Sequence, residues 1–352
     1  MFTLFMKYLR WLLFPFSLLY GLVVVVRNWC YNTGIFKSRG FNLPVIAVGN
    51  LDVGGAGKSP MTEYLIRLFK TNYKLATLSR GYGRATKGFV LGNAQSTATE
   101  IGDEPAQFKS KFPNITVAVC EKRVDGIEAL QADHNLIILD DAYQHRAVKP
   151  GFSILLLDYN RLYDPRLLLP AGNLREPYSG RKRADVVIIS KCPATLEPIH
   201  QTKIKERVRP LLHQEVFFTS ISYLPLQQMD GVAASMSIDT DTTIFLLTGI
   251  ANAGPLLAHL QKQTLHIIHH KYPDHHQFSL KNISKLADDF WACTSQKKII
   301  ITTEKDAQRL GGQELQELVK KLGILVQPIG IEFLNNQQSQ FDKLVYNYVR
   351  KY

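Results

Sequence analysis

The stretch that decides the fold is Val45-Ile46-Ala47-Val48-Gly49-Asn50-Leu51-Asp52-Val53-Gly54-Gly55-Ala56-Gly57-Lys58-Ser59-Pro60. An apolar segment typical of a strand leads into a glycine-rich loop that ends in Gly-Lys-Ser, and we predict a helix over Met61 to Lys70. Glycines let successive backbone N–H groups converge on a polyphosphate, and the N-terminal end of the following helix attracts the same anion. Strand, loop and helix in this order predict a phosphate-binding P-loop.

The residue types in the loop suit this chemistry. The predicted nucleotide-binding residues are the loop itself: Asp52, Val53, Gly54, Gly55, Ala56, Gly57, Lys58 and Ser59. Lys58 would place a point charge on the phosphates, and the Ser59 hydroxyl can bind Mg²⁺. The usual pattern G-x-x-x-x-G-K-[ST] has glycine where this chain has Asp52, so Gly54 and Gly55 must supply the flexibility. A loop with a purely structural role is the alternative.

Buried strands alternate with helices beyond the loop. Apolar runs of strand type end at Leu78, Cys120, Leu139, Leu157 and Ile189, and this alternation predicts a parallel, doubly wound α/β sheet. Asp140 and Asp141 directly follow one of these runs, as in a Walker B strand. Paired carboxylates at the carboxyl edge of a P-loop sheet suit Mg²⁺, although two turn residues would look the same.

The basic composition indicates an anionic partner. The 352-residue chain has a formal net charge of +12, with 45% hydrophobic and 20% charged residues. A nucleic acid, a membrane surface or a phosphorylated ligand would each explain this charge, but no nucleic-acid-binding module is recognisable. The four cysteines are widely spaced and form no C-x-x-C pair, which fits a reducing, cytosolic setting.

Residues 1–35 are predicted to form an N-terminal, interfacial membrane segment. Between Arg10 and Arg27 the chain runs about 16 residues without a charge, which is short of the roughly 20 that span a bilayer as a helix. Pro15 should kink a helix there. Aromatic and basic neighbours, among them Lys7 and Trp11, favour a helix lying in the cytoplasmic leaflet. A tilted span, a buried core helix and a signal peptide are the alternatives, although no cleavage site is evident.

The rest of the chain divides into two predicted units. Residues 36–224 contain the P-loop and form the kinase domain, and residues 225–242 are polar and poor in strand signals, as in an inter-domain linker. Residues 243–352 begin with a new apolar strand and are predicted to form a second, smaller α/β domain. The fold class is therefore a P-loop NTPase-like α/β domain with a membrane-associated N-terminal helix and a second α/β domain.

Seven motifs follow one another along the chain. They are Gly49-Asn50-Leu51 with the P-loop, Ser79-Arg80-Gly81-Tyr82, Gly102-Asp103-Glu104-Pro105, Asp140-Asp141-Ala142-Tyr143-Gln144-His145-Arg146, Leu169-Pro170-Ala171-Gly172-Asn173-Leu174-Arg175-Glu176-Pro177, Pro273-Asp274-His275-His276 and Thr303-Glu304-Lys305-Asp306-Ala307. Together they resemble the tetraacyldisaccharide 4'-kinase (lipid A 4'-kinase) family of Gram-negative bacteria, over most of the chain. Ala142 and Tyr143 replace the usual Gly and Phe, and Asn252-Ala253-Gly254-Pro255 is looser than the usual Gly-Ile-Ala turn. Neither departure removes a reacting group.

The resemblance implies an ATP-dependent kinase that transfers the γ-phosphate to the 4'-hydroxyl of a tetraacyldisaccharide 1-phosphate and so forms lipid IVA. It implies ATP and Mg²⁺ as cofactors. The implied partners are the lipid A disaccharide 1-phosphate and an anionic membrane surface, with no nucleic acid and no obligate protein partner. The implied location is the cytoplasmic face of the inner membrane.

The resemblance also implies a role for individual residues. Lys58 would hold the β and γ phosphates, and Asp103 with His275 would form the acid–histidine pair that accepts the proton of the sugar hydroxyl. By itself, Asp103 looks like an ordinary helix-start acid. The implied Mg²⁺ ligands are Ser59, Asp140, Asp141 and Glu176. The implied supporting residues are Arg80, Tyr82, Arg123, Gln144, His145 and Arg175, and one of the three arginines would neutralise the developing charge.

Three other classes of protein fit the motifs less well. A membrane-associated P-loop switch of the MinD type would carry a lysine where this chain has Val53. A GTPase would need an aspartate after Ser190-Lys191-Cys192, and a nonenzymatic lipid-binding scaffold would not need Lys58 together with two aspartates. The histidine cluster that precedes and includes His275 has no tetrahedral metal-site spacing.

Overall fold

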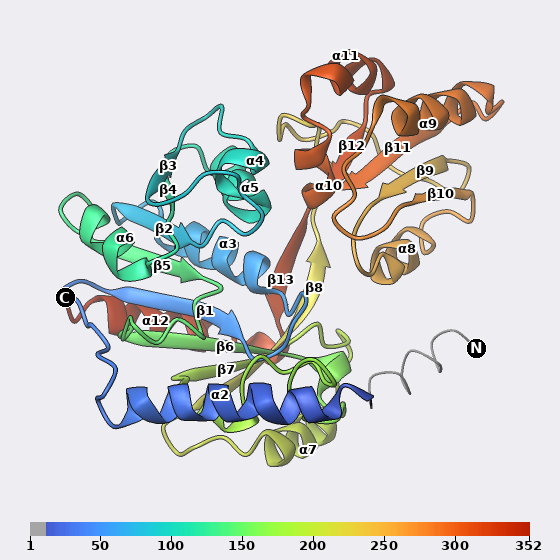
Figure 1. Ribbon diagram of the computed structural model, residues 1–352. Helices are drawn as coiled ribbons and strands as arrows, with labels where there is room; N and C mark the ends of the chain where they lie inside the picture. Colours follow the sequence, from blue (N-terminus) through green and yellow to red (C-terminus); the bar gives the residue numbers. More distant parts are fainter. Residues whose placement is uncertain (1–11) are drawn as a thin grey trace.

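The computed structural model describes residues 12–352. Residues 1–11 of the predicted membrane segment, with Lys7, Arg10 and Trp11, lie outside the described residues. The described chain forms two α/β units, a larger one built around a wide sheet and a smaller one beside it, joined at the strands β8 and β13 (Figure 1). The predicted α/β class with a parallel sheet is confirmed.

The larger unit is built on a nine-stranded sheet in the order β13-β8-β7-β6-β1-β5-β2-β4-β3. Its strands are β1 (Val45–Asn50), β2 (Leu75–Ser79), β3 (Val90–Gly92), β4 (Thr116–Val119), β5 (Leu136–Asp140), β6 (Phe152–Asp158), β7 (Val186–Ser190), β8 (Glu215–Tyr223) and β13 (Ile329–Phe333). Neighbours are parallel except at the two edges, where β3 pairs with β4 and β13 with β8 in antiparallel fashion. The P-loop strand β1 is the central strand, so the loop leaves the middle of the carboxyl edge.

Apolar side chains on both faces of β1 explain why helices cover the sheet on two sides. Ile46 and Val48 pack into one core and Val45 and Ala47 into the opposite one. The first core is covered by α3 (Lys58–Phe69), α5 (Asp103–Lys111) and α12 (Gln338–Val349), and the other face by α6 (Arg123–Leu130) and α7 (Pro198–Val208). The short α4 (Ala98–Ile101) precedes α5, and the 3₁₀ turns are η1 (Tyr159–Arg161), η2 (Tyr178–Arg183) and η3 (Leu334–Asn336).

The smaller unit repeats the same layering around a four-stranded parallel sheet in the order β10-β9-β11-β12. Its strands are β9 (Thr243–Thr248), β10 (Ile267–Lys271), β11 (Lys298–Thr303) and β12 (Leu325–Gln327). One face packs against α8 (Gly254–Leu260) and the other against α9 (Leu280–Ala292) and α11 (Gln313–Leu322). Helix α10 (Glu304–Arg309) begins directly after β11, with Thr303 as its N-cap.

The end of the chain returns to the larger unit. The sequence placed all of residues 243–352 in the second domain, but β13 pairs with β8 and α12 packs into the core of the larger unit. Phe341 is fully buried there, and the Tyr348 hydroxyl accepts from the backbone N–H of Val45 on β1 at 2.9 Å. The second unit therefore ends near residue 327, because the apolar face of α12 is complementary to the larger sheet.

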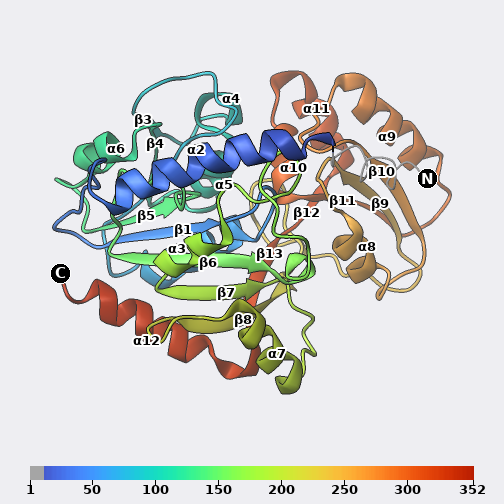
Figure 2. The ribbon, with the colours of Figure 1, turned by 60° about the horizontal axis from the view of Figure 1, so that its bottom comes forward.

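Helix α2 (Phe14–Asn32) lies along the larger unit (Figure 2). The distribution of its polar and apolar side chains is unusual. Its polar positions face the protein: Ser17 is buried, and the Tyr20 hydroxyl donates to the carbonyl of Arg175 at 2.7 Å. Its large apolar side chains, including Phe16, Leu19, Leu22, Val23 and Trp29, are exposed. The alternative of a buried core helix is therefore wrong. Pro15 lies in the first turn of α2, where its missing N–H costs no hydrogen bond. Most of the segment before Pro15 lies outside the described residues, so the predicted kink stays a prediction.

Removing the Phe341 side chain is expected to destabilise the larger unit. A Phe341→Ala substitution leaves a cavity against the central sheet and should lower the free energy of unfolding by about 3–5 kcal/mol. Urea unfolding followed by circular dichroism measures the change, with Asn347→Ala, at an exposed position of α12, as control. Equal stability of the two variants would contradict the assignment of α12 to this core.

Candidate active site

The P-loop leaves β1 and ends in the first turn of α3. Gly54 and Gly57 have φ angles of +104° and +85°, which glycine adopts without strain. Gly57 is the N-cap of α3 and makes no side-chain cap, while Lys58 and Ser59 are the first two helical residues. The first N–H groups of α3 and the positive end of its dipole are thus arranged to bind an anion.

The Lys58 ammonium lies where the loop meets the acidic pair. Its Nζ donates to Asn50 Oδ1 at 3.1 Å and lies 3.5 Å from Asp141 Oδ1. Asn50 is fully buried, and its amide nitrogen donates to the carbonyl of Asp52 at 2.8 Å. One amide side chain therefore braces the loop and orients the lysine.

Asp140 reaches the loop because β5 is the neighbour of β1, with Val48 paired to Asp140. It is 4% exposed, and its Oδ1 accepts from the Thr62 hydroxyl, one turn into α3, at 2.9 Å. Burial, followed by the charge of Asp141, raises the pKa of Asp140 to about 6. A buried carboxylate next to a second acid gains strongly from a cation, so this position suits Mg²⁺.

Asp141 has a different electrostatic environment. Arg175 donates to both of its carboxylate oxygens at 3.0 Å, and Lys58 lies on the other side. Burial by itself would raise the pKa of Asp141, but Lys58 and Arg175 outweigh burial and hold this pKa below its usual value. Asp141 therefore has two cationic partners, whereas the buried carboxylate of Asp140 forms no ion pair within the described residues.

Glu176 lies behind this pair, in a network that also reaches α2. The carboxylate, 2% exposed, accepts from Arg183 at 2.8 and 2.9 Å and from the Gln144 amide at 3.0 Å. Asn28 of α2 donates to it at 3.4 Å. Gln144 in turn donates to the carbonyl of Asn50 at 2.8 Å. Glu176 thus orients Gln144 against the P-loop strand, and its predicted role as a metal ligand stays a prediction.

Arg123 and His145 form a second, largely buried layer. The His145 Nε2 accepts from the backbone N–H of Arg123 at 3.3 Å. Burial, with Arg123 as the next cause, lowers the pKa of His145 to about 4, so the imidazole is neutral near pH 7. Burial also lowers the pKa of Arg123, to about 10, which leaves its guanidinium charged. Arg80 is exposed and Tyr82 is 81% exposed, both in the loop that follows β2.

The structure brings Asp103 and His275 together from the two units. Asp103 begins α5, and Gly102 packs against Gly81 beyond β2, which places this turn at the carboxyl edge of the sheet. His275 lies in the loop between β10 and α9, with a φ of +58° and its N–H bonded to the carbonyl of Gly249 at 3.1 Å. Its Nδ1 is 3.4 Å from Asp103 Oδ2. The predicted acid–histidine contact therefore exists across the boundary between the units.

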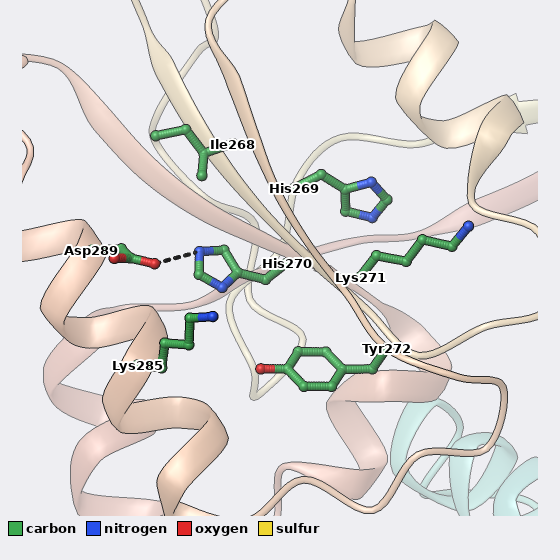
Figure 3. A pocket seen from close by; sticks show the side chains of 7 residues that line it. All are labelled: Ile268, His269, His270, Lys271, Tyr272, Lys285 and Asp289. Carbon is green, nitrogen blue, oxygen red and sulfur yellow. Dashed lines mark ion pairs between the residues drawn. The ribbon is translucent and has the colours of Figure 1, made fainter.

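A cavity of about 360 Å³ lies elsewhere, at the open edge of β10, and is not part of this site (Figure 3). His270 and Asp289 line it and contact each other at 3.4 Å, and Figure 3 shows His269 on the other side of the strand. The Nε2 of His269 is hydrogen-bonded to the Thr248 hydroxyl at 2.8 Å, and His276 stacks on Tyr272.

Some residues of the site were not singled out from sequence. Asn50 and Thr62 position Lys58 and Asp140, and Arg161 donates to the carbonyl of Val53 in the P-loop at 2.5 Å. Arg309 contacts Asp103 and His275. Asn50 stood within a recognised motif, but Thr62, Arg161 and Arg309 have no local pattern, because their partners lie far away in sequence.

Comparison with known proteins agrees with this geometry. The family model "Tetraacyldisaccharide-1-P 4'-kinase" matches residues 9–350. Curated tetraacyldisaccharide 4'-kinases include one from Flavobacterium psychrophilum, 46% identical over 98% of both chains, and one from Bacteroides thetaiotaomicron, 44% identical over 99% of this chain and 95% of the relative.

A solved structure resembles the whole fold. The crystal structure of LpxK from Aquifex aeolicus in complex with ATP superposes with a TM-score of 0.76 at 28% identity, covering 97% of this chain and 99% of that one. The family match and the relatives extend over nearly the full length of the chain, including the P-loop, the aspartate pair and the acid–histidine pair. The chain therefore belongs to the tetraacyldisaccharide 4'-kinase family.

Proposed function

We propose that this protein transfers the γ-phosphoryl group of ATP to the 4'-hydroxyl of a tetraacyldisaccharide 1-phosphate. Family membership supports the reaction, and one structural observation carries it: Lys58 joins the phosphate loop to the acidic pair, at 3.1 Å from Asn50 and 3.5 Å from Asp141. This arrangement places a phosphate site beside a metal site, as phosphoryl transfer requires. The product of the proposed reaction is lipid IVA.

The P-loop fits a polyphosphate. The left-handed glycines and the N-terminus of α3 present backbone donors, and a Cβ at Gly54 would approach the Arg161 guanidinium to 3.2 Å. Arg161 therefore backs the loop from behind, while Lys58 lies at its mouth. Lys58 is then placed to hold the β and γ phosphates of ATP.

The metal-binding residues of the proposal are Ser59, Asp140 and Asp141, with Glu176 retained as a predicted ligand. The fit rests on Asp140, a buried carboxylate whose pKa is raised by burial and by a neighbouring acid. Mg²⁺ bound here would neutralise charge on the phosphates. Arg175 keeps Asp141 oriented and ionised through two 3.0 Å contacts, and Arg175, Arg123 or exposed Arg80 would balance charge that develops during transfer.

Asp103 and His275 form the proposed proton acceptor. The sugar hydroxyl must lose its proton as it attacks, and a carboxylate with a contacting imidazole can accept it. Glu104, next to Asp103, is close enough to Asp140 to raise its pKa, so the first turn of α5 faces the metal-binding residues. Asp103 and the phosphate-binding loop therefore serve one reaction centre.

Helix α2 is the proposed membrane contact, at the cytoplasmic face of the inner membrane. It is long and apolar enough to be a candidate span, yet it docks its polar side on the protein and exposes its apolar side. A helix held along its length by Leu168, Arg175 and Gln144 cannot be surrounded by lipid. We therefore favour a helix lying in the interface, where it would bring the site to an acylated acceptor.

Loss of the Lys58 charge is expected to stop the reaction. Lys58→Ala leaves the backbone cradle in place but the phosphate charge unbalanced, so transfer of ³²P from γ-labelled ATP to a lipid A precursor in detergent should fall about 10³-fold or more. Lys70→Ala, at the other end of α3, is the control. Near-normal transfer by Lys58→Ala would remove the P-loop assignment, and ATP hydrolysis without lipid labelling in the unmodified protein would favour a P-loop switch.

Charges on the outer face of α2 are expected to weaken membrane binding. Leu19 and Leu22 are 63% and 61% exposed, so replacing both with Glu should not disturb the docked side. In a flotation assay the variant should no longer float with anionic phospholipid vesicles. Its KM for the lipid acceptor should rise, with little change in its KM for ATP. Leu91→Glu, on the edge strand β3, is the control. Unchanged flotation would rule out α2 as the contact.

Asp103 and His275 are expected to act as one unit. Asp103→Ala and His275→Ala should each lower kcat by about 10²- to 10⁴-fold while ATP binding is nearly kept. The double variant should lose little more, because removing one member already disables the pair. Steady-state kinetics of the three variants give the coupling. Losses that multiply would assign the two residues independent roles and take the proton-accepting function from the pair.

A further inference from the structure

Arg309, the last residue of α10, lies between the two members of the acid–histidine pair. Its Nη2 donates to Asp103 Oδ2 at 2.8 Å and to His275 Nδ1 at 3.1 Å. The side chain is 1% exposed, whereas the His275 side chain is 56% exposed. A buried cation thus contacts both the acid from the larger unit and the histidine from the smaller one.

Arg309 is itself held in place from within the smaller unit. Its Nη1 donates to the carbonyl of Gly249 at 3.0 Å and to Asp306 Oδ1 at 3.1 Å. Asp306, fully buried, also accepts from the N–H of Gly249 at 3.0 Å and from the Thr303 hydroxyl at 2.7 Å. The guanidinium is therefore held by contacts within the smaller unit that do not involve Asp103, and its second nitrogen points out of this network toward the pair.

The hydrogen bonds define what the two partners can do. A guanidinium only donates and keeps its proton, so the Nδ1 that accepts from it must carry a lone pair. The hydrogen bond from Arg309 also fixes the orientation of the His275 ring. Asp103 Oδ2 likewise accepts from the same Arg309 nitrogen, in a charge-assisted hydrogen bond. These contacts fix the position of the Asp103 carboxylate and the orientation of the His275 ring relative to each other.

We propose that Arg309 is a positioning residue of the reaction: it aligns Asp103 with His275 when the two units come together. The inference rests on the proposed role of this pair as proton acceptor. Arg309 takes no proton itself and adds no covalent step. It sets the distance and the relative orientation of Asp103 and His275, and a small displacement of such groups costs much of the rate.

Other ion pairs between the same helices serve as a comparison. Lys305 pairs with Glu104 at 2.9 Å, and Lys111 pairs with Glu304, so α5 and α10 are joined without Arg309. Neither lysine contacts Asp103 or His275 in the described residues. If Arg309 only joined the two units, removing Lys305 would have a similar effect on the reaction.

The test compares Arg309→Ala, Arg309→Lys and Lys305→Met in the full-length protein. Arg309→Ala should lower kcat about 10²-fold with a KM for ATP within about threefold of the original, because the phosphate site is untouched. Guanidinium ion added to Arg309→Ala should restore part of the lost rate. Arg309→Lys keeps the charge beside Asp306, so it should fold normally, yet lose at least about tenfold in kcat because one ammonium cannot reproduce the planar fork.

Two further measurements distinguish a failure of the Arg309 proposal from a failure of the proposed proton acceptor. The double variant Arg309→Ala with Asp103→Ala should be no slower than Asp103→Ala alone, and guanidinium should not rescue it. A loss in Lys305→Met equal to that in Arg309→Lys, or multiplying losses in the double variant, would overturn the positioning role. Full activity of Asp103→Ala would instead overturn the proposed proton acceptor and leave the kinase assignment in place.

Discussion

The structure depends on the uncapped start of α3. Gly57 offers no side chain to the first N–H groups of this helix, and left-handed glycines bend the loop away from β1. Exposed helix-start donors need an acceptor, and an anion of high charge satisfies several at once. Because β1 is the central strand, the same point lies beside the carboxyl end of β5, so the phosphate site and the acidic pair arise together.

The second unit contributes His275 and Arg309, which lie outside the P-loop sheet. His275 lies across the boundary between the units from Asp103, and the contact between them depends on how α10 meets α5. The two helices carry complementary charges along their contact, with acids at the start of α5 facing Lys305 and Arg309. Ion pairs at such a boundary specify alignment more than they stabilise it. Their arrangement aligns the two units so that Asp103 and His275 lie in contact.

The N-terminal helix reverses the usual pattern of a surface helix. A helix on a water-soluble protein buries its apolar face, but α2 buries Ser17, Gly21 and Val24 and exposes most of its leucine, valine and phenylalanine side chains. Gly21 is needed for this close approach, because a Cβ there would come within 2.8 Å of the Leu168 side chain. The docked side also touches Gln144 and Glu176, so the helix that would meet lipid is joined to residues behind Asp140 and Asp141.

The sequence by itself determined the local chemistry: the P-loop, the aspartates after a buried strand, the apolar N-terminal run and the alternation of strands with helices. These follow from short-range patterns, since a strand period, a glycine-rich turn or an uncharged run is complete within some 20 residues. The resemblance to a family added Asp103 and His275, which no local pattern joins. Only the tertiary structure decided that Arg309 lies between them, that α12 returns to the first core and that α2 turns its apolar face outward. Each of these results from contacts between segments tens to hundreds of residues apart, where packing and charge complementarity select the partner and sequence spacing carries no information.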